Sequence, residues 1–204
     1  TGFLTDAFPG RVAAFINKEG KRFVREDGRR DDMSKAILNQ TDSLMYYIVK
    51  YDGDINDAKS LAGQPVTYLI EAGVSEYMYA TDIADAAKQM NVPEENLRTT
   101  LANFDEHVKS QTADEFGCVS FPGAFENGPF VIYARRPAAH HTMGGVKINT
   151  AAEVLTEAGE AIPGLYAAGE VTGGVHGGNR LGGNAIVDFL VYGQIAGTNA
   201  ALGK

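Results

Sequence analysis

Gly164–Ile186 has the sequence GLYAAGEVTGGVHGGNRLGGNAI, and a shorter stretch upstream, His140–Gly145, has the sequence HHTMGG. These stretches and the residues between them hold eleven of the chain's 24 glycines and three of its four histidines. Glycine is favoured where the backbone approaches another group closely or adopts a positive φ. We therefore expect the two stretches to surround one large planar ligand with oxygen-rich arms.

The composition is that of an ordinary soluble globular protein. The 204 residues are 44% hydrophobic and 22% charged, which suits one large or two small domains. A net charge of −8 without a Lys/Arg-rich run argues against nucleic acid as a partner. The apolar runs are shorter than the roughly 20 residues of a membrane span, so no membrane insertion is expected. The single cysteine, Cys118, leaves the compartment, cytoplasmic or periplasmic, undetermined.

Strand and helix patterns alternate before residue 128 and predict a mixed α+β fold. The expected elements are strands at 12–16, 21–24 and 44–49, and helices at about 32–40, 62–72, 82–90 and from residue 93 onward. Thr81 is the expected N-cap of the third helix. The fourth helix is the clearest, because its apolar residues recur three or four positions apart. They are Leu97, Leu101, Phe104 and Val108.

Turn-forming residues at Pro122-Gly123 and Asn127-Gly128-Pro129 predict a domain boundary, which divides the chain into residues 1–128 and 129–204. The second part is expected to contain strands at 130–134 and 146–149, a hairpin over 154–162, a buried strand at 165–168 and a helix from Asn184 onward.

A helix that begins near Asn184 directs free backbone amides towards whatever lies before it, and its dipole favours negative charge there. Ala185 and Ile186 are the expected amide donors, and a reduced flavin with its charge near N1 and O2 is a suitable acceptor. Glu170 follows the predicted strand and can accept hydrogen bonds from ribityl or ribose hydroxyls. A solvated surface carboxylate is the alternative interpretation of Glu170.

Histidines and an arginine form a second group, made of His140, His141, His176 and Arg180. An arginine offers two parallel hydrogen bonds to a carboxylate, and a histidine offers a further donor. A metal site is not expected, because adjacent histidines in an extended segment point to opposite faces. The group therefore indicates an anion site beside the glycine-rich stretches.

Taken together, these motifs closely resemble the C-terminal part of FAD-dependent fumarate reductase flavoproteins of the soluble, flavocytochrome-like kind, a family that includes urocanate reductases. NKEGKRFV at 17–24 and RDDMSKAIL at 30–38 resemble that family's mobile capping domain. The resemblance implies a capping (clamp) domain over 1–128 and the C-terminal part of a Rossmann-like FAD-binding domain over 129–204. It also implies FAD as cofactor and anaerobic respiration as a setting.

The resemblance further implies the reduction of fumarate to succinate, with hydride from flavin N5 and a proton from Arg30. Arg29 is the alternative proton donor if the loop register differs by one residue. The implied substrate-binding residues are Thr5, Asp6, His140, Arg180 and Gly183. The implied FAD-binding residues are His141, Glu170, Ala185 and Ile186.

Two features depart from the family pattern. Asp6 and Pro9 stand where the family's proton relay has Glu and Arg, so urocanate, with Asp6 as a ligand for its imidazole, is a second candidate substrate. No Gly-x-Gly-x-x-Gly fingerprint for the FAD pyrophosphate follows a strand. We therefore expect this chain to be the C-terminal portion of a longer polypeptide, with an FMN or haem domain as electron donor and little FAD affinity alone.

Three other classes are kept as alternatives. Two are flavin enzymes of the same superfamily, an aspartate oxidase and a steroid dehydrogenase, against which the histidine pair and the Arg30 segment argue. The third is a non-catalytic module in which the glycine-rich stretches hold a small anion.

Overall fold

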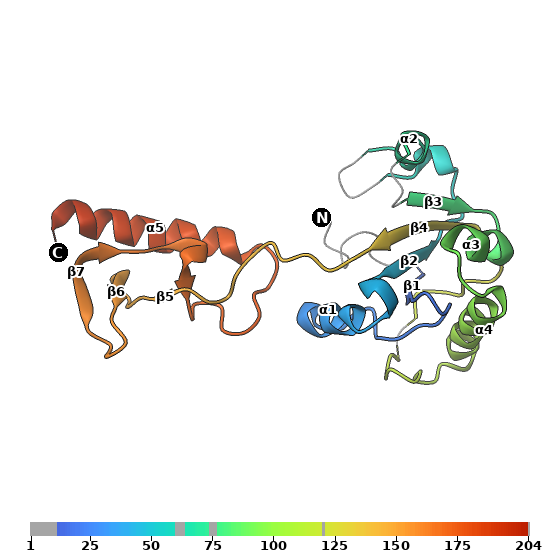
Figure 1. Ribbon diagram of the computed structural model, residues 1–204, viewed down its shortest axis with the longest axis horizontal. Helices are drawn as coiled ribbons and strands as arrows, with labels where there is room; N and C mark the ends of the chain where they lie inside the picture. The colour runs from blue at the N-terminus through green and yellow to red at the C-terminus, as the bar shows by residue number, and fades with distance from the viewer. Residues whose placement is uncertain (1–11, 60–63, 74–76, 120, 204) are drawn as a thin grey trace. The chain divides into compact units, whose positions relative to one another are not determined.

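The computed structural model describes residues 12–59, 64–73, 77–119 and 121–203. The chain divides into two compact units between Ala138 and Ala139 (Figure 1). Sequence patterns place the division earlier, after residue 128. The difference arises because the strand that begins at Phe130 is paired on both sides within the sheet of the first unit.

The first unit is built on a four-stranded antiparallel sheet in the order β1-β2-β4-β3. Its strands are β1 Ala13–Ile16, β2 Met45–Lys50, β3 Tyr77–Ala80 and β4 Phe130–Arg135. β2 and β4 are central, and Ile48 lies opposite Ile132 in their register. Both central strands are almost continuously apolar, as expected for strands that are buried on both faces.

Helices cover both faces of this sheet (Figure 1). Alternate side chains of β2 point to opposite faces, so Tyr46 and Ile48 join one core cluster while Tyr47 and Val49 join the other. The first cluster is closed by α3 Ile83–Met90 and α4 Glu94–Ser110, and the second by α1 Arg30–Leu38 and α2 Val66–Glu71. Short 3-10 helices lie at Thr41–Ser43 and Ile55–Asp57.

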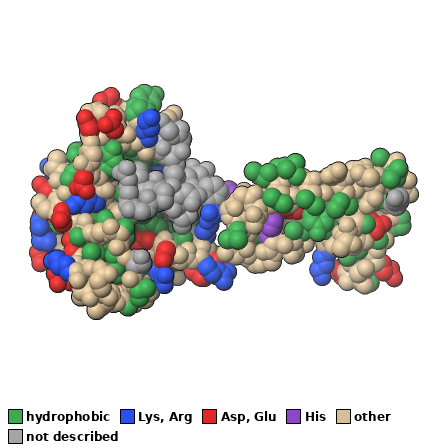
Figure 2. Space-filling view, turned by 180° about the vertical axis from the view of Figure 1, so that it is seen from behind, with side chains coloured by type: hydrophobic (Ala, Val, Ile, Leu, Met, Phe, Trp, Pro, Cys, Tyr) green, Lys and Arg blue, Asp and Glu red, His purple; other side chains and the backbone are tan. Residues whose placement is uncertain are grey.

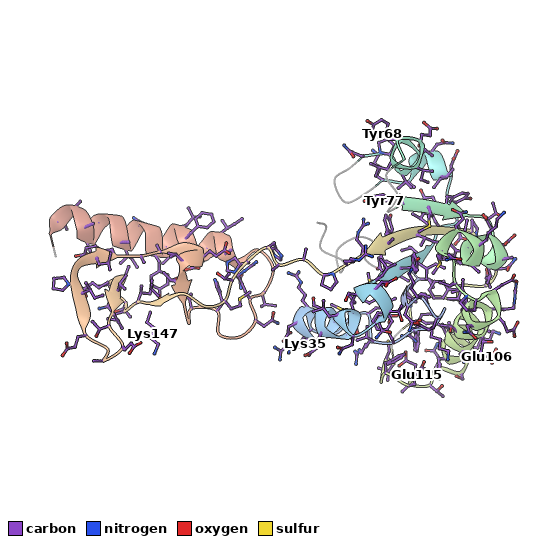
Figure 3. The ribbon with its side chains drawn as sticks, in the orientation of Figure 1. Lys35, Tyr68, Tyr77, Glu106, Glu115 and Lys147 are labelled. Atoms are coloured by element: carbon purple, nitrogen blue, oxygen red, sulfur yellow. The ribbon has the colours of Figure 1, made fainter. Side chains whose placement is uncertain are left out.

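The apolar stripe predicted on α4 is confirmed. Leu97 and Leu101 are fully buried, and Val108 packs partly buried against the same cluster. The outward surfaces of α1 and α4 carry charged side chains such as Lys35 and Glu106 (Figure 3). α4 is therefore amphipathic in the way that its sequence predicts.

Two local predictions in this unit are wrong. The N-cap of α3 is Asp82, not Thr81, because the Asp82 carboxylate accepts a hydrogen bond from the amide of Asp85. The return strand predicted at 21–24 is reduced to a single bridge between Ile16 and Arg22.

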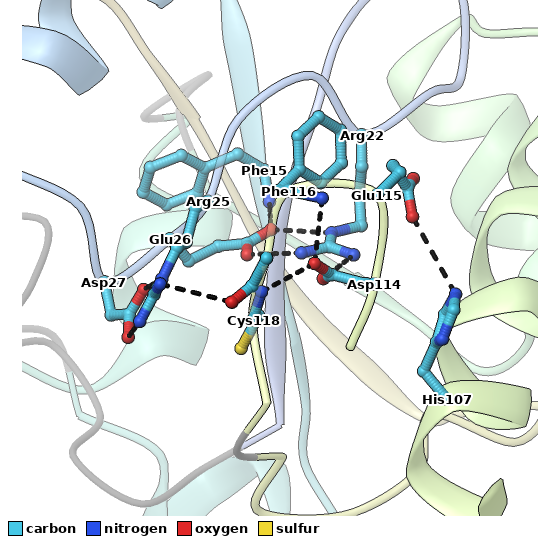
Figure 4. Close-up of polar contacts among 11 residues, drawn as sticks. Phe15, Arg22, Arg25, Glu26, Asp27, His107, Asp114, Glu115, Phe116 and Cys118 are labelled. Atoms are coloured by element: carbon cyan, nitrogen blue, oxygen red, sulfur yellow. Dashed lines mark hydrogen bonds and ion pairs between the residues drawn. The ribbon is translucent and has the colours of Figure 1, made fainter. Parts of the chain in front are cut away.

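A buried ion network holds the chain at Arg22, where the predicted hairpin is reduced to one bridge. The Arg22 guanidinium is 2.9 Å from an oxygen of Asp114 and 2.7 Å from an oxygen of Glu26 (Figure 4). Its Cζ atom also lies 5.1 Å from the ring centre of Phe104 and 5.0 Å from that of Phe116. These contacts anchor the segment before α1 to the loop after α4.

The second unit contains two small pairs of strands and one long helix. β5 Val146–Lys147 pairs in parallel with β8 Thr172–Gly173, and β6 Glu153–Leu155 pairs antiparallel with β7 Ala161–Tyr166. A 3-10 helix, η4, spans Gly169–Val171, and α5 spans Asn184–Leu202. The predicted hairpin over 154–162 and the predicted helix from Asn184 are confirmed.

Two glycines make the β5–β8 contact possible. A Cβ atom on Gly173 would lie 2.7 Å from the backbone nitrogen of Gly145, and one on Gly145 would overlap the carbonyl oxygen of Val171. Such separations are too short for any real Cβ contact. The glycine at each position is therefore required by close backbone approach, as the sequence predicts for this stretch.

α5 is apolar around most of its circumference, and much of it is exposed in this chain. Val187 and Leu190 are each 61% exposed, and Figure 2 shows hydrophobic side chains gathered along this unit. By length and composition alone α5 could cross a membrane, since its mean hydropathy is 1.2. The search for uninterrupted apolar runs in the sequence did not find this helix, because glycine and polar residues interrupt it. The strand predicted as buried at 165–168 is only partly buried, since Leu165 is 46% exposed and the three residues after it are half-buried.

Candidate functional site

The second unit brings three glycine-rich segments together around two histidines. The His176 Nε2 atom is 3.0 Å from an Asp188 Oδ2 atom in the second turn of α5. The ring of His141 packs edge-on against the ring of His176, with centroids 6.0 Å apart and an interplanar angle of 72°. The histidine pair segment, the loop at 173–183 and the start of α5 thus meet at one place.

Several buried polar atoms at this place have no partner among the residues that the structure describes. They are both ring nitrogens of His141, the Nε atom of Arg180 and the Oδ1 atom of Asp188. A buried polar atom left without a hydrogen bond costs roughly 1–3 kcal/mol. Such atoms on three neighbouring segments of the chain therefore point to a group that is bound there.

Arg180 is the strongest of these indications. The residue is only 8% exposed, and its Nη1 atom donates to the Leu181 carbonyl at 3.1 Å. Within the described part of the chain no acidic side chain forms an ion pair with it. A buried guanidinium without a counter-ion is costly, and a carboxylate or phosphate is the group that its geometry matches. An oxygen-rich anionic ligand such as FAD or a carboxylate substrate fits this donor set.

Glu170 lies in η4 and makes a local contact. Its carboxylate accepts a hydrogen bond of 2.9 Å from the amide of Thr142, and its carbonyl oxygen accepts one from the Thr142 hydroxyl. Glu170 therefore holds the histidine segment beside η4, and its expected contact with a cofactor hydroxyl stays a prediction.

The start of α5 agrees with the sequence in position and differs in detail. The helix begins at Asn184, and Gly183 precedes it with a φ of 84°, a conformation that favours glycine. Ile186 was expected to offer a free amide. In the structure that amide donates to the carbonyl of Gly183 at 3.0 Å, which closes the first turn. Its exposed side chain and the neighbouring Ala185 remain the candidates for cofactor contact.

The remaining predicted residues lie in the first unit, next to His141, or outside the described residues. Arg30 is the first residue of α1 and is half-buried, whereas Arg29 is exposed and paired with Asp31 at 3.1 Å. His140 is exposed in the second unit. Thr5 and Asp6 lie outside the described residues.

One residue of this cluster was missed by sequence reasoning. Asp188 is the only charged residue in the apolar helix α5, and it is buried with 6% exposure. An acid at that position in an otherwise apolar helix was the available signal. Among the described residues no group of three or more His, Cys, Asp or Glu side chains could hold a metal ion.

The chain belongs to the FAD-binding domain family, whose sequence model matches residues 1–186. This membership confirms the flavoprotein resemblance, and FAD is the cofactor. The fumarate reductase (cytochrome) of Shewanella frigidimarina is 41% identical over 198 residues, which cover 97% of this chain and 33% of that protein. The NADH:acrylate oxidoreductase of Vibrio harveyi is 40% identical over 193 residues, 95% of this chain and 19% of the relative.

A urocanate reductase of Eggerthella lenta is 39% identical over 190 residues, which cover 93% of this chain and 31% of that protein. The open conformation of a flavocytochrome c3 fumarate reductase matches the structure with a TM-score of 0.69 and 38% identity, over 94% of this chain and 33% of that one. The mixture of helices and strands thus matches an FAD-binding flavoenzyme fold. This chain spans a third or less of the length of these relatives.

Proposed function

We propose that this chain forms the substrate-binding part of a flavin-dependent oxidoreductase that reduces the C=C bond of a small α,β-unsaturated carboxylate, with fumarate to succinate as the leading reaction. The observation that carries the proposal is the buried guanidinium of Arg180, which has no ion-pair partner in the described part of the chain, on the same loop as His176, whose ring contacts that of His141. A substrate carboxylate supplies the negative charge that this guanidinium lacks. The same substrate class is supported by the names of three relatives, which are a fumarate reductase, a urocanate reductase and an acrylate reductase.

Each named residue has a role in this reaction. Arg180 and His140 bind and orient one carboxylate, while Thr5 contacts the other end of the substrate and Gly183 lies beside it. FAD supplies hydride chemistry when it is bound, and His141, Glu170, Ala185 and Ile186 contact it. The arginine cation at the carboxylate also withdraws electrons from the adjacent double bond, which stabilises the negative charge that develops as hydride adds.

Arg30 is the proposed proton donor to the second alkene carbon. An arginine has a high intrinsic pKa, so it releases a proton slowly unless the proton is replaced from solvent through a relay. Its half-buried position favours it over Arg29, which is 62% exposed and held by Asp31. Asp6, near the start of the chain, is the proposed relay residue if fumarate is the substrate.

Urocanate is the second candidate substrate, because an aspartate at Asp6 suits the imidazole of urocanate and a urocanate reductase is 39% identical. Turnover by the full-length flavoprotein tests both, with reduced methyl viologen as donor and fumarate, urocanate or acrylate as acceptor. Arg30→Ala is expected to abolish turnover while FAD stays bound, and Arg29→Ala is the matched control that retains it. Absence of turnover with every acceptor, in a full-length protein that also lacks a normal flavin spectrum, would favour an anion-binding module instead.

We also propose that the first unit corresponds to the capping domain and the second to the C-terminal part of the FAD-binding domain. The rest of the same polypeptide would cover α5 and contribute the pyrophosphate fingerprint, and an FMN or haem domain would deliver electrons. Support comes from the exposed apolar side chains of α5 and from the greater length of the relatives. The isolated 204 residues should then bind FAD weakly, and tight one-to-one binding in a titration followed by flavin fluorescence would contradict this arrangement.

A further inference from the structure

We infer that His176 and Asp188 are a positioning pair that sets the geometry of the proposed carboxylate site, an inference that rests on the proposed function. The pair is buried, since the side chains of His176 and Asp188 are 14% and 3% exposed. It joins two elements of different kinds, because His176 belongs to the glycine-rich loop and Asp188 to α5. Six of the loop's eleven residues from 173 to 183 are glycine, so few side chains are available to hold the loop by packing.

His141 extends this junction to the third segment. Its ring contacts the ring of His176 edge-on, and it is the immediate neighbour of His140. Arg180 lies four residues after His176 on the same loop. A displacement of His176 would therefore move both proposed carboxylate ligands, His140 through the ring contact and Arg180 through the loop.

Asp188 can fix the orientation of the His176 ring because its carboxylate has no other hydrogen-bond partner in the described part of the chain. Its Oδ1 atom is buried and has no partner in the described part of the chain, so the hydrogen bond at Oδ2 is the one that holds this carboxylate. An acceptor at Oδ2 makes Nε2 the protonated ring nitrogen and fixes the ring's orientation. Because an asparagine offers a carbonyl oxygen of the same reach, Asp188→Asn can keep this contact, whereas Asp188→Ala removes it.

The experiment compares KM with kcat in the full-length, FAD-loaded protein and adds a binding measurement that needs no turnover. Malonate, a saturated dicarboxylate, is titrated while the flavin absorption spectrum is followed. Asp188→Ala and His176→Ala are expected to raise the fumarate KM and the malonate Kd about tenfold, the size of one lost charge-assisted hydrogen bond. The kcat should change much less, and Asp188→Asn should restore binding close to the wild type.

Asn199→Ala is the matched control, because it removes a side-chain hydrogen bond from the same helix at the far end, where Asn199 donates to the Ala151 carbonyl at 2.9 Å. Should an alanine variant fail to hold FAD, His176→Phe keeps an aromatic ring against His141 but removes the donor, and the same rise is expected. Wild-type KM and Kd in these variants, or an Asp188→Asn variant as impaired as Asp188→Ala, would overturn the positioning role. A wild type that neither reduces nor binds any of these acids would overturn the proposed function instead.

Discussion

Asp114→Ala should destabilise the first unit strongly, although the residue lies in a loop. Its side chain is fully buried, and that of its partner Arg22 is 3% exposed. The Asp114 carboxylate also accepts hydrogen bonds of 2.9 Å from the amide of Phe116 and 2.8 Å from that of Cys118. Truncation therefore removes the acceptor of both loop amides and leaves a buried guanidinium with Glu26 as its remaining partner.

The expected loss of unfolding free energy follows from the contacts that the substitution removes. Breaking a buried ion pair by removing one partner typically costs about 3–5 kcal/mol. Arg22 keeps Glu26, which places the expected loss of unfolding free energy near the lower end, about 3 kcal/mol. Arg98→Ala is the matched control on α4, because it removes an exposed pair with Glu94, for which a loss of about 0.3–0.5 kcal/mol is expected.

Urea unfolding followed by near-UV circular dichroism measures the difference. Most of the signal reports the first unit, since seven of the nine tyrosines lie there and tryptophan is absent. A loss for Asp114→Ala no larger than that for Arg98→Ala would refute the view that this network holds the loop to the sheet.

Three further outcomes are expected. Burial raises the pKa of the Asp114 carboxyl, but hydrogen bonds from the Cys118 amide and Arg22 outweigh burial, so its pKa in the folded protein lies below the usual value. The stability that Asp114 contributes is therefore full above about pH 4 and is lost as the pH falls through the folded pKa. Asp114→Asn should remove this acid dependence in urea titrations at a series of pH values. Gly145→Ala should abolish the β5–β8 contact and expose the second unit to limited proteolysis, whereas Gly178→Ala, with open space around its Cβ, should not. Leu101→Ala should cost about 2–5 kcal/mol in the same urea assay, and a loss below about 1 kcal/mol would contradict its placement in the core.

Local patterns predicted much of the secondary structure. The strand at Met45–Lys50, the helix at Glu94–Ser110 and the helix at Asn184–Leu202 all follow periodicities that lie within one element. Local patterns could not predict the partner of Arg22, because Asp114 lies 92 residues away along the chain. Arg22 lies in the predicted return strand at 21–24, and only the fold shows that its guanidinium is buried while the neighbouring Arg25 and Arg29 are exposed.

At the candidate site, too, local sequence patterns predict some features while contacts between distant residues do not show in the sequence. Glycine-rich stretches and histidines predict where the candidate site lies, because close backbone approach requires glycine and the residue types are unusual for a plain loop. The hydrogen bond between His176 and Asp188 joins a loop to a helix, so it depends on three-dimensional packing that the sequence does not display. Whether the Ile186 amide is free likewise depends on how the first turn of α5 closes, because that amide donates to the carbonyl of Gly183.

The order of the strands in the first unit has a consequence for how that unit folds. β4 is the last of its four strands to appear along the chain, yet it lies between β2 and β3, and β3 pairs with β4. The sheet stays open until residues near 130 arrive, and contacts between such distant segments slow folding. A chain that ended at residue 128, where turn-forming residues suggest a boundary, would leave two strands with bare edges ready to pair with a neighbouring molecule.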